Sequence, residues 1–504
     1  MLALAYVLAM PRNLFPADES YFLSESKRIL GGEALYRDIF WIGGPISQWT
    51  MAAIFAIFGV TITVARTTLG VLHGTLVVLL YLSGRRLGVR AVLALAPPLL
   101  YFAFCYPVMP CITPHTFSTL AMVAILYALL SPNRLTRPSV VWVPGVYTAA
   151  LALSHPHQGV TFALATVGLF AAEAAIARHS AEAPPSGAWW PTWQWYALGI
   201  SVVAVPALLA LLATAGPRPL FEQTILMPFT GYREHNQAPW GAVTWPPWAA
   251  YTWPPLLRYS PLIMLPACIH LLRGWRQRRT RAELTAAATL VAVGIAAMTS
   301  VANLPDIVHV SFVASVFFVA GAAAIDSRCF GLARRHPAAR VVVWPLALAI
   351  LGITTTQMAR NHTRMWAQYP YPIDTVFGRV DFEHDGERLM VQRLNAAVAH
   401  GSRVAFVYPM WASLYLTTDT INPTAHHLIL PRYLSEVEIH RTIAKLAATR
   451  PPTVLVVNTI PVEPDDPFVA WIKSNYIVID PEPQARPAFT IYRLRDDAPP
   501  SPAG

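Results

Sequence analysis

Long apolar runs recur along almost the whole chain before residue 358, and few charged residues interrupt them. Of the 504 residues, 55% are hydrophobic and only 13% are charged. A soluble globular chain carries roughly 25% charged residues, so this chain lacks the charge to cover a water-facing surface of its size. A helix of about 20 apolar residues spans a bilayer. The sequence therefore predicts an α-helical polytopic membrane protein.

The apolar runs indicate about eleven transmembrane helices, give or take about two. The predicted spans cover residues 1–15, 65–84, 91–109, 115–131, 140–154, 158–177, 194–214, 256–272, 283–301, 307–325 and 341–357. A shorter run over residues 46–60 is either a further span or a re-entrant or surface helix. Because residues 1–10 are too short to span alone, either residues 11–15 complete the first helix or the true start lies upstream.

Arginines cluster in alternate loops between the predicted spans. The basic loops contain residues 85–90, 134–137, 178, 273–281 and 328–340. No lysine or arginine lies in the loops around 105–115, 154–158 and 302–308. The positive-inside rule makes the basic loops cytoplasmic, which places the N-terminus inside and the C-terminus outside a bacterial inner membrane. These loops also account for the net charge of +10, so we expect no nucleic-acid partner.

The composition changes near residue 358, where acidic residues become frequent. Residues 403–408, 453–457 and 489–494 have the apolar pattern of strands, and residues 435–448 have that of a helix. The sequence thus predicts a small C-terminal α/β domain on the outer side. It contains neither a glycine-rich phosphate loop nor a nucleophile elbow.

An acidic pair, Asp18-Glu19, follows the first apolar segment. Two adjacent carboxylates at a membrane surface are costly to desolvate, and they add nothing to an apolar core. One interpretation is that they cap a helix over residues 20–30, because acidic residues suit the positive end of a helix dipole. The other is a general base, which takes a proton from an acceptor hydroxyl or amine during group transfer. The two interpretations are compatible.

Two further polar groups lie in loops predicted to face outward. Tyr36, Arg37 and Asp38 lie between glycine turns, in a loop that is either merely solvated or part of a binding site. Asp306 and His309 are spaced i, i+3 and so share one helix face. They are either a helix cap with a satisfied histidine or groups that bind the donor or acceptor.

His155 and His157 lie in an outward hairpin between two spans. The interpretation we favour is that they line a sugar pocket. As an alternative they ligate a divalent cation with Asp18 or Glu19, since imidazole and carboxylate suit several such ions. The four cysteines form no CxxC pair, so neither a disulfide framework nor a zinc site is indicated. We predict no cofactor and no metal, and a divalent cation stays the alternative.

Residues 217–255 form a long outward loop rich in tryptophan and tyrosine. Such residues form an aromatic belt at the membrane surface, or a platform for sugar and lipid. Arg233 is the cation in this loop that we expect to meet a lipid phosphate, because guanidinium groups suit phosphate oxygens. Arg218 and Arg258 compete for that role.

The acidic pair opens a longer run of motifs. It is followed by Gly32-Glu33, Tyr36-Arg37-Asp38, Gly44-Pro45, Phe58-Gly59, Arg66 and Arg85-Arg86-Leu87. This run resembles the N-terminal signature of the C-type (GT-C) membrane glycosyltransferases, in particular the dolichyl-phosphate-mannose protein mannosyltransferase and aminoarabinose transferase group. Residues 303–309 resemble a second motif of bacterial relatives in part, because Leu304 stands where those relatives have arginine. Segments of the tail, such as 422–424, also resemble their extracytoplasmic domain.

The resemblance implies a GT-C transmembrane domain over residues 1–357, with the acidic motif in a first outer loop over 16–45, and an extracytoplasmic domain over 358–504. In that family the first acid of the pair is catalytic, which gives the role to Asp18 and makes Glu19 its neighbour. The implied reaction moves a sugar from a polyprenyl-phosphate donor to an outer-face acceptor, with inversion. The implied partners are the donor lipid, membrane lipids and a glycan, lipid or protein acceptor.

Two other functions stay open at this point: a transporter of lipids or solutes, and an inactive scaffold in envelope assembly. Transporter sites lie near the bilayer midplane on broken helices, whereas acidic residues are nearly absent from the middle of these spans. The intact Asp18-Glu19 pair argues against an inactive relative.

Overall fold

Contacts divide the chain into two compact units, and each is described by itself. The computed structural model describes residues 1–135, 137–179, 189–229, 240, 255–277, 280–326, 338–398, 402–429, 434–462, 465–480 and 488–496. The first unit comprises Met1–Val7, Leu69–Ala210 and Asn236–Arg364. The second comprises Leu8–Thr68, Leu211–His235 and Met365–Gly504.

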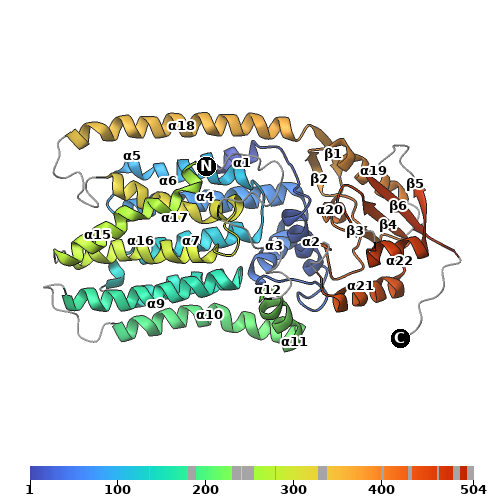
Figure 1. The fold of residues 1–504 in the computed structure, drawn as a ribbon, viewed down its shortest axis with the longest axis horizontal. Helices are drawn as coiled ribbons and strands as arrows, with labels where there is room; N and C mark the ends of the chain where they lie inside the picture. The colour runs from blue at the N-terminus through green and yellow to red at the C-terminus, as the bar shows by residue number, and fades with distance from the viewer. Residues whose placement is uncertain are drawn as a thin grey trace. The chain divides into compact units, whose positions relative to one another are not determined.

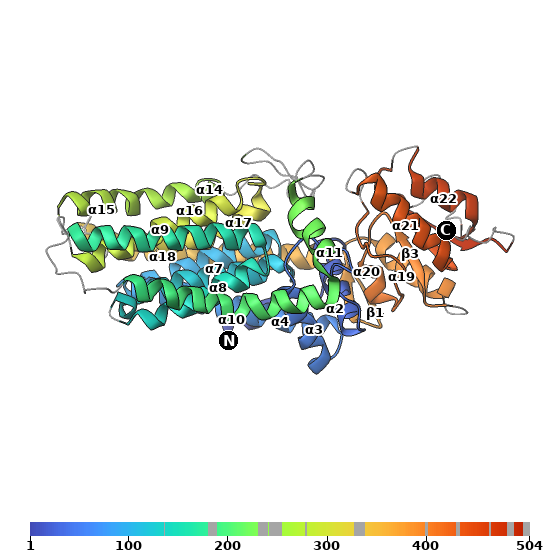
Figure 2. The same cartoon turned by 90° about the horizontal axis from the view of Figure 1, so that it is seen from below.

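The first unit is a bundle of helices, and its long helices run roughly alongside one another (Figures 1 and 2). In chain order the helices are α1 (Leu2–Leu8), α4 (Ile62–Arg86), α5 (Ala91–Ala94), α6 (Ala96–Leu100), α7 (Pro114–Leu129), α8 (Trp142–Ala152), α9 (Pro156–His179), α10 (Trp189–Ala215), α14 (Pro255–Arg258), α15 (Leu265–Arg276), α16 (Arg281–Ser300), α17 (Ile307–Ile325) and α18 (Ala338–Gln368). The first turns of α4 and the last turns of α10 and α18 belong to the second unit.

Six helical segments within the described residues are long and apolar enough to cross a membrane. They are Ile62–Arg86, Ala91–Val108, Pro156–Arg178, Thr192–Ala215, Arg281–Ser300 and Ile307–Ile325. Three shorter apolar helices, Ile46–Phe58, Pro114–Leu129 and Pro138–Ala152, also coincide with predicted apolar runs. The protein is therefore a multi-pass membrane protein, as the sequence predicts.

Of the two alternatives for the first span, the one in which residues 11–15 complete a helix over residues 1–15 is wrong. Helix α1 covers only Leu2–Leu8. Pro11 and Pro16 explain the difference, because proline has no amide hydrogen to donate and disfavours helix at the residue before it.

Close helix packing in the first unit depends on glycine. Helices α8 and α10 approach each other at Gly145 and Gly199. A Cβ on Gly145 would collide with the carbonyl oxygen of Tyr196 and lie 3.1 Å from the Cα of Gly199. A Cβ on Gly199 would collide with the carbonyl oxygen of Trp142. Small residues let membrane helices approach in this way.

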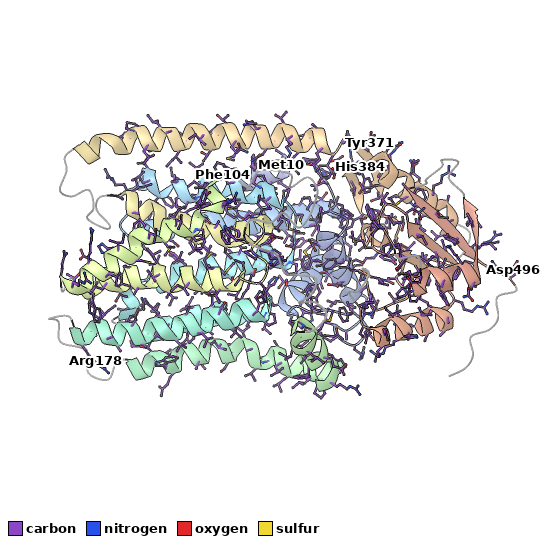
Figure 3. The ribbon with its side chains drawn as sticks, in the orientation of Figure 1. Met10, Phe104, Arg178, Tyr371, His384 and Asp496 are labelled. Carbon is purple, nitrogen blue, oxygen red and sulfur yellow. The ribbon has the colours of Figure 1, made fainter. Side chains whose placement is uncertain are left out.

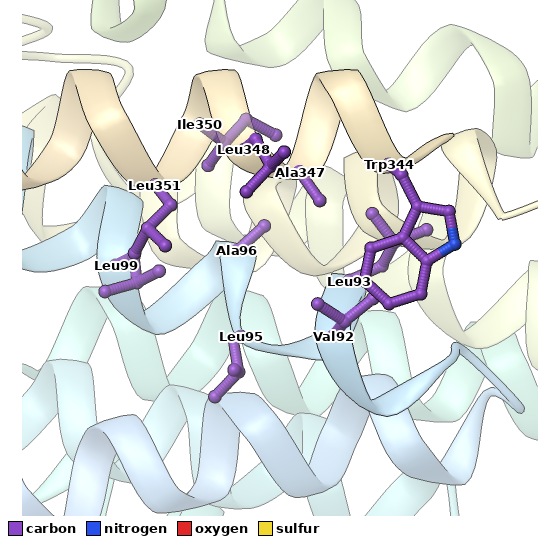
Figure 4. Close-up of a pocket in the computed structure, with 10 residues that line it drawn as sticks. All are labelled: Val92, Leu93, Leu95, Ala96, Leu99, Trp344, Ala347, Leu348, Ile350 and Leu351. Carbon is purple, nitrogen blue, oxygen red and sulfur yellow. The ribbon is translucent and has the colours of Figure 1, made fainter. Parts of the chain in front are cut away.

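An apolar groove lies between α5–α6 and α18 (Figure 4). The ring of Trp344 lies beside Val92 and Leu93 at one end, and Leu99 and Leu351 lie at the other. All ten side chains that line the groove are apolar. It holds no group that could carry acid–base chemistry, so we exclude it from the candidate site.

The second unit combines the segment that bears the acidic pair with the C-terminal α/β domain. Its elements are α2 (Asp18–Leu30), α3 (Ile46–Phe58), α11 (Pro217–Phe221), α12 (Met227–Phe229), β1 (Tyr371–Thr375), β2 (Gly378–Phe382), α19 (Asp385–Val398), β3 (Ala405–Tyr408), α20 (Ser413–Thr417), α21 (Glu436–Thr449), β4 (Thr453–Val457), α22 (Pro467–Asn475), β5 (Tyr476–Asp480) and β6 (Phe489–Leu494). Tyr371 and His384, labelled in Figure 3, mark the start of β1 and the residue before α19.

The C-terminal sheet has the order β3-β4-β6-β5. β3 and β4 are parallel, and the other two pairs are antiparallel. The strands predicted over residues 453–457 and 489–494 are confirmed, and the strand predicted over 403–408 begins at Ala405. Ser435 caps the predicted helix by accepting a hydrogen bond from the Glu438 amide. The hairpin β1–β2 and strand β5 are not predicted.

We predict that Gly145→Ala and Gly199→Ala each destabilise the helix bundle by about 1–3 kcal/mol, because a methyl group there meets backbone that cannot move aside. Gly168→Ala on α9 is the matched control, since nothing lies within 4 Å of its added Cβ. Thermal unfolding in nanodiscs measures both. Equal melting temperatures for Gly145→Ala and Gly168→Ala would contradict the close approach of α8 and α10.

Candidate functional site

Glu19 is completely buried at the start of α2, and both of its carboxylate oxygens accept hydrogen bonds. Oε2 accepts from Nη2 of Arg66 at 2.9 Å and from the Phe15 amide at 3.1 Å. Oε1 accepts from Nη1 of the same guanidinium. Arg66 lies in the first turns of α4 and also donates to the carbonyl of Asn13. Glu19 therefore fixes the residues that lead into α2, and its charge is neutralised inside the unit.

Asp18, the first residue of α2, differs from its neighbour in being only partly buried. Oδ1 accepts a hydrogen bond from the Tyr21 hydroxyl at 3.2 Å. A general base must be reachable by the group that gives up its proton. Of the two acids, Asp18 meets that requirement, whereas Glu19 holds the helix that carries it.

The loop after α2 is held by its own polar side chains. Tyr36 is 2% exposed, has a φ of 67°, and donates to the carbonyl of Gly43 at 2.6 Å. Asp38 accepts from the Ala34 amide at 2.9 Å and from Nη2 of Arg37 at 2.8 Å. The Arg37 guanidinium also holds the pKa of Asp38 below its ordinary value. Of the three predicted binding residues here, Arg37 is the most exposed, and its guanidinium is paired with the partly exposed carboxylate of Asp38.

A second buried acid, Glu25, lies on α2 two turns after Asp18 and so on the same helix face. It is 2% exposed, and Nε2 of Gln48 donates to Oε2 at 3.3 Å. Burial raises the pKa of Glu25 to about 8, although the Gln48 hydrogen bond and the charge of Arg28 oppose the shift. The side chain therefore holds a proton at neutral pH.

The first unit brings four histidines together from three helices and the turn before α9. The rings of His115 and His155 stack at a centroid distance of 4.2 Å, and His115 stacks on Phe312 at 4.5 Å. The ring of His309 meets that of His115 edge-on at 5.2 Å, and that of His157 lies 6.0 Å from His155. We call these five rings the histidine cluster.

Asp306 both caps α17 and orients His309. Its Oδ1 accepts from the backbone amide of His309 at 2.9 Å and lies 2.8 Å from Nδ1 of the same residue. The pair shares a face, as the spacing predicts. A carboxylate that holds Nδ1 fixes the tautomer and leaves Nε2 to meet a ligand. The capping interpretation and the binding interpretation are therefore compatible here too.

The predicted residues thus fall into two groups. Asp18, Glu19, Tyr36, Arg37 and Asp38 lie in the second unit. His155, His157, Asp306 and His309 lie together in the first. Arg233 lies outside the described residues.

No binding role is predicted from the sequence for two members of the histidine cluster, His115 and Phe312. His115 lies at its centre, and its position at the end of a loop without basic residues was the available signal. Phe312 lies one turn after His309 and looks like any core residue of an apolar helix. In the part of the chain that the structure describes, no three His, Cys, Asp or Glu side chains are arranged to hold a metal ion.

The sequence matches no protein-family model and no curated protein. Among solved structures, the chain is similar to ArnT from Cupriavidus metallidurans bound to undecaprenyl phosphate, with a TM-score of 0.60 and 13% identity over 99% of this chain and 97% of that one. It is similar to the apo state of the same ArnT with a TM-score of 0.57 and 14% identity, over 97% and 95% of the two chains. The chain has the fold of the GT-C membrane glycosyltransferases.

A third GT-C structure extends the likeness. The apo oligosaccharyltransferase of Archaeoglobus fulgidus matches with a TM-score of 0.50 and 11% identity, over 83% of this chain and 63% of that one. The fold inferred from the acidic motif is thereby confirmed. At these identities the likeness concerns the path of the chain, so the roles of individual residues rest on the contacts described above.

We predict that Glu19→Gln destabilises the protein by about 3–5 kcal/mol, because it leaves the buried charge of Arg66 uncompensated. Glu222→Gln is the matched control. Glu222 pairs with Arg218 on the surface, where such a pair contributes about 0–1 kcal/mol. Thermal unfolding of both variants measures the difference. If Glu19→Gln melts no earlier than Glu222→Gln, the Glu19–Arg66 pair does not hold the start of α2.

We predict that Glu25→Gln raises stability at pH 8 and leaves it unchanged near pH 4.5. The unfolded chain loses this proton near pH 4.5, whereas the folded protein keeps it until about pH 8. The unfolded state therefore binds fewer protons between these values, and the stability of the wild type falls as the pH rises. Melting curves from pH 4.5 to 8 test this. A constant difference between variant and wild type across that range would refute it.

Proposed function

We propose that this protein is an integral membrane glycosyltransferase. It moves a sugar from a polyprenyl-phosphate donor to an acceptor on the outer face of a bacterial inner membrane. Residues 1–357 form the catalytic transmembrane domain, and residues 358–504 form an extracytoplasmic domain.

One observation carries the proposal: the likeness, over 99% of this chain, to an ArnT structure that holds undecaprenyl phosphate. The multi-pass membrane architecture of the chain also supports the proposal. A lipid-linked sugar reaches a multi-pass protein through the bilayer, and the absence of a glycine-rich phosphate-binding loop from the sequence is consistent with such a donor.

Asp18 is the general base of the proposed reaction. It accepts the proton of the acceptor hydroxyl or amine while that oxygen or nitrogen attacks the anomeric carbon. The bond from the anomeric carbon to the phosphate oxygen breaks, and polyprenyl phosphate leaves with the bonding electrons. A single displacement inverts the anomeric centre. Glu19 and Arg66 hold Asp18 at the start of α2, and the hydrogen bond from Tyr21 orients its carboxylate.

The remaining predicted residues bind the donor or the acceptor. Arg37 is an exposed cation in the loop after α2, suited to the negative charge that develops on the leaving phosphate. We assign the same role to Arg233. His155, His157 and the Asp306–His309 pair supply imidazole groups that can hydrogen-bond sugar hydroxyls or phosphate oxygens.

We predict that Asp18→Asn lowers turnover by about 10²–10⁴-fold, because an amide cannot accept the acceptor's proton. The amide oxygen can still accept the hydrogen bond from Tyr21, so folding should be retained. The measurement is sugar release from a panel of radiolabelled polyprenyl-phosphate sugars by full-length protein in nanodiscs.

Asp374→Asn is the control for that experiment, since Asp374 lies in the exposed hairpin strand β1. Turnover of one donor by the wild type and this control, lost in Asp18→Asn, would establish the class and identify the sugar. Full activity of Asp18→Asn would overturn the mechanism. If folded wild-type protein turns over no donor, a transporter or a scaffold becomes the better account.

A further inference from the structure

The segment that carries the acidic pair is bound on one side by the C-terminal α/β domain. Both belong to the second unit, so their contacts lie within one compact body. The contacting residues of the C-terminal domain come from α20 and the turns after it. We call Tyr415, Asp419, Ala425, His426 and His427 the clamp.

The first contact joins the clamp to α2. Nζ of Lys27 donates to Oδ1 of Asp419 at 2.8 Å and to the carbonyl of Tyr415 at 3.2 Å. Arg403, beside β3, binds the other carboxylate oxygen of Asp419 and donates from Nε to its carbonyl at 3.1 Å. Asp419 thus connects the last turn of α2 with the sheet of the C-terminal domain.

The second contact joins the clamp to the loop after α2. The Arg28 guanidinium lies 3.1 Å from Nε2 of His427, and since arginine has only donors, His427 accepts. The same guanidinium donates to Glu33 at 3.0 Å and to the carbonyl of Asp38 at 3.1 Å. One side chain of α2 therefore holds both the loop and the clamp.

The third contact is made by Phe40 near the end of that loop. Its amide donates to the carbonyl of Ala425 at 3.0 Å, and its ring lies 4.7 Å from that of His426. His426 and His427 are 4% and 7% exposed. The loop is thus attached to the clamp through buried groups, whereas α2 is attached through the partly exposed Lys27–Asp419 pair.

The backbone of Asp419 supports a positioning role. Its φ of 52° lies in the left-handed region, which residues with a side chain adopt rarely and at a cost in free energy. This conformation presents the carboxylate to Lys27 and Arg403 together. Asn tolerates the left-handed region as well as Asp does, so Asp419→Asn removes the charge without new backbone strain.

We propose that the clamp positions α2 and the loop after it, so that Asp419 and His427 are positioning residues for the carboxylate of Asp18. The C-terminal domain is then part of the catalytic unit rather than an appendage. The effect on turnover rests on the proposed function, whereas the mechanical effect on α2 does not. The experiment therefore measures both.

The test compares Asp419→Asn with wild type, full-length in nanodiscs, by amide hydrogen exchange and by turnover. We expect exchange in α2 and residues 31–45 to rise about two- to ten-fold, and kcat to fall by a similar factor with little change in KM. Asp385→Asn is the matched control, because Asp385 pairs with Arg388 within α19 and its side chain is 43% exposed against 37% for Asp419.

A second variant, Lys27→Met, keeps the apolar stem and removes the partner charge. Because Lys27 and Asp419 bind each other, the double variant should raise exchange in α2 by less than the sum of the effects of the two single variants. Unchanged exchange in α2 in Asp419→Asn would overturn the proposal, and so would faster exchange with unchanged kcat in an active enzyme. If the wild type turns over no donor, the proposed function fails, and exchange alone decides whether the clamp holds α2.

Discussion

The buried ion pair between Glu19 and Arg66 is the interaction on which the candidate active site depends. Two unlike charges in a dry interior are tolerated only when geometry and extra hydrogen bonds offset their desolvation. Here the carboxylate also accepts the Phe15 amide, and the guanidinium also binds the carbonyl of Asn13. The pair therefore joins three stretches of chain: the residues before α2, the first turn of α2, and the start of α4. The position of Asp18 therefore depends on the ion pair between its neighbour Glu19 and Arg66.

This arrangement explains why two adjacent acids are useful. One carboxylate that is both buried as an anchor and reachable as a base would have to satisfy opposite demands. In the proposed reaction these two demands fall on consecutive residues, which point to different surroundings because successive side chains on a helix are about 100° apart. Glu19 is sealed from solvent and Asp18 is partly open. From the residues alone the pair is a cap or a base, and the family resemblance gives the catalytic role to Asp18. The contacts add that Glu19 is buried in an ion pair whereas Asp18 is only partly buried.

Much of the fold can be predicted from the sequence, because a long apolar run identifies a spanning helix even when single residues within it vary. A spanning helix requires about 20 apolar residues, so apolar runs locate α4, α9, α10, α16 and α17 without reference to anything else. β4 and β6 follow from short apolar runs with turn residues at each end. β5 and the β1–β2 hairpin were missed. Tyr371, Ile477 and Val478 are exposed hydrophobic residues, so neither segment has a regular alternation of apolar and polar residues. The β-branched residues of β5 agree with its strand conformation, so here local propensity and tertiary pairing act together.

Only some residues of the candidate site were predictable from the sequence. Charge patterning predicts that His155, His157, Asp306 and His309 face one side of the membrane. The structure brings the three histidines into the histidine cluster and places Asp306 against His309. Their partner Phe312 carried no signal, because an apolar residue in an apolar helix is the default. Gln48 and Gln223 were missed for a related reason. Each hydrogen-bonds a group distant in sequence, Glu25 and the carbonyl of Tyr36 respectively, and only the folded chain reveals such pairs.

At 13% identity to ArnT, most residues differ between the two chains, yet the path of the chain persists. An apolar pattern survives substitution because any apolar residue of about the right size supports a bilayer span. Polar anchors have no such freedom: Arg66 must meet a carboxylate, and Arg28 must meet acceptors on both the loop and the clamp. The positions at which this chain requires particular residues therefore include a few buried polar contacts of the second unit. Those contacts, rather than the spans, decide where Asp18 is held.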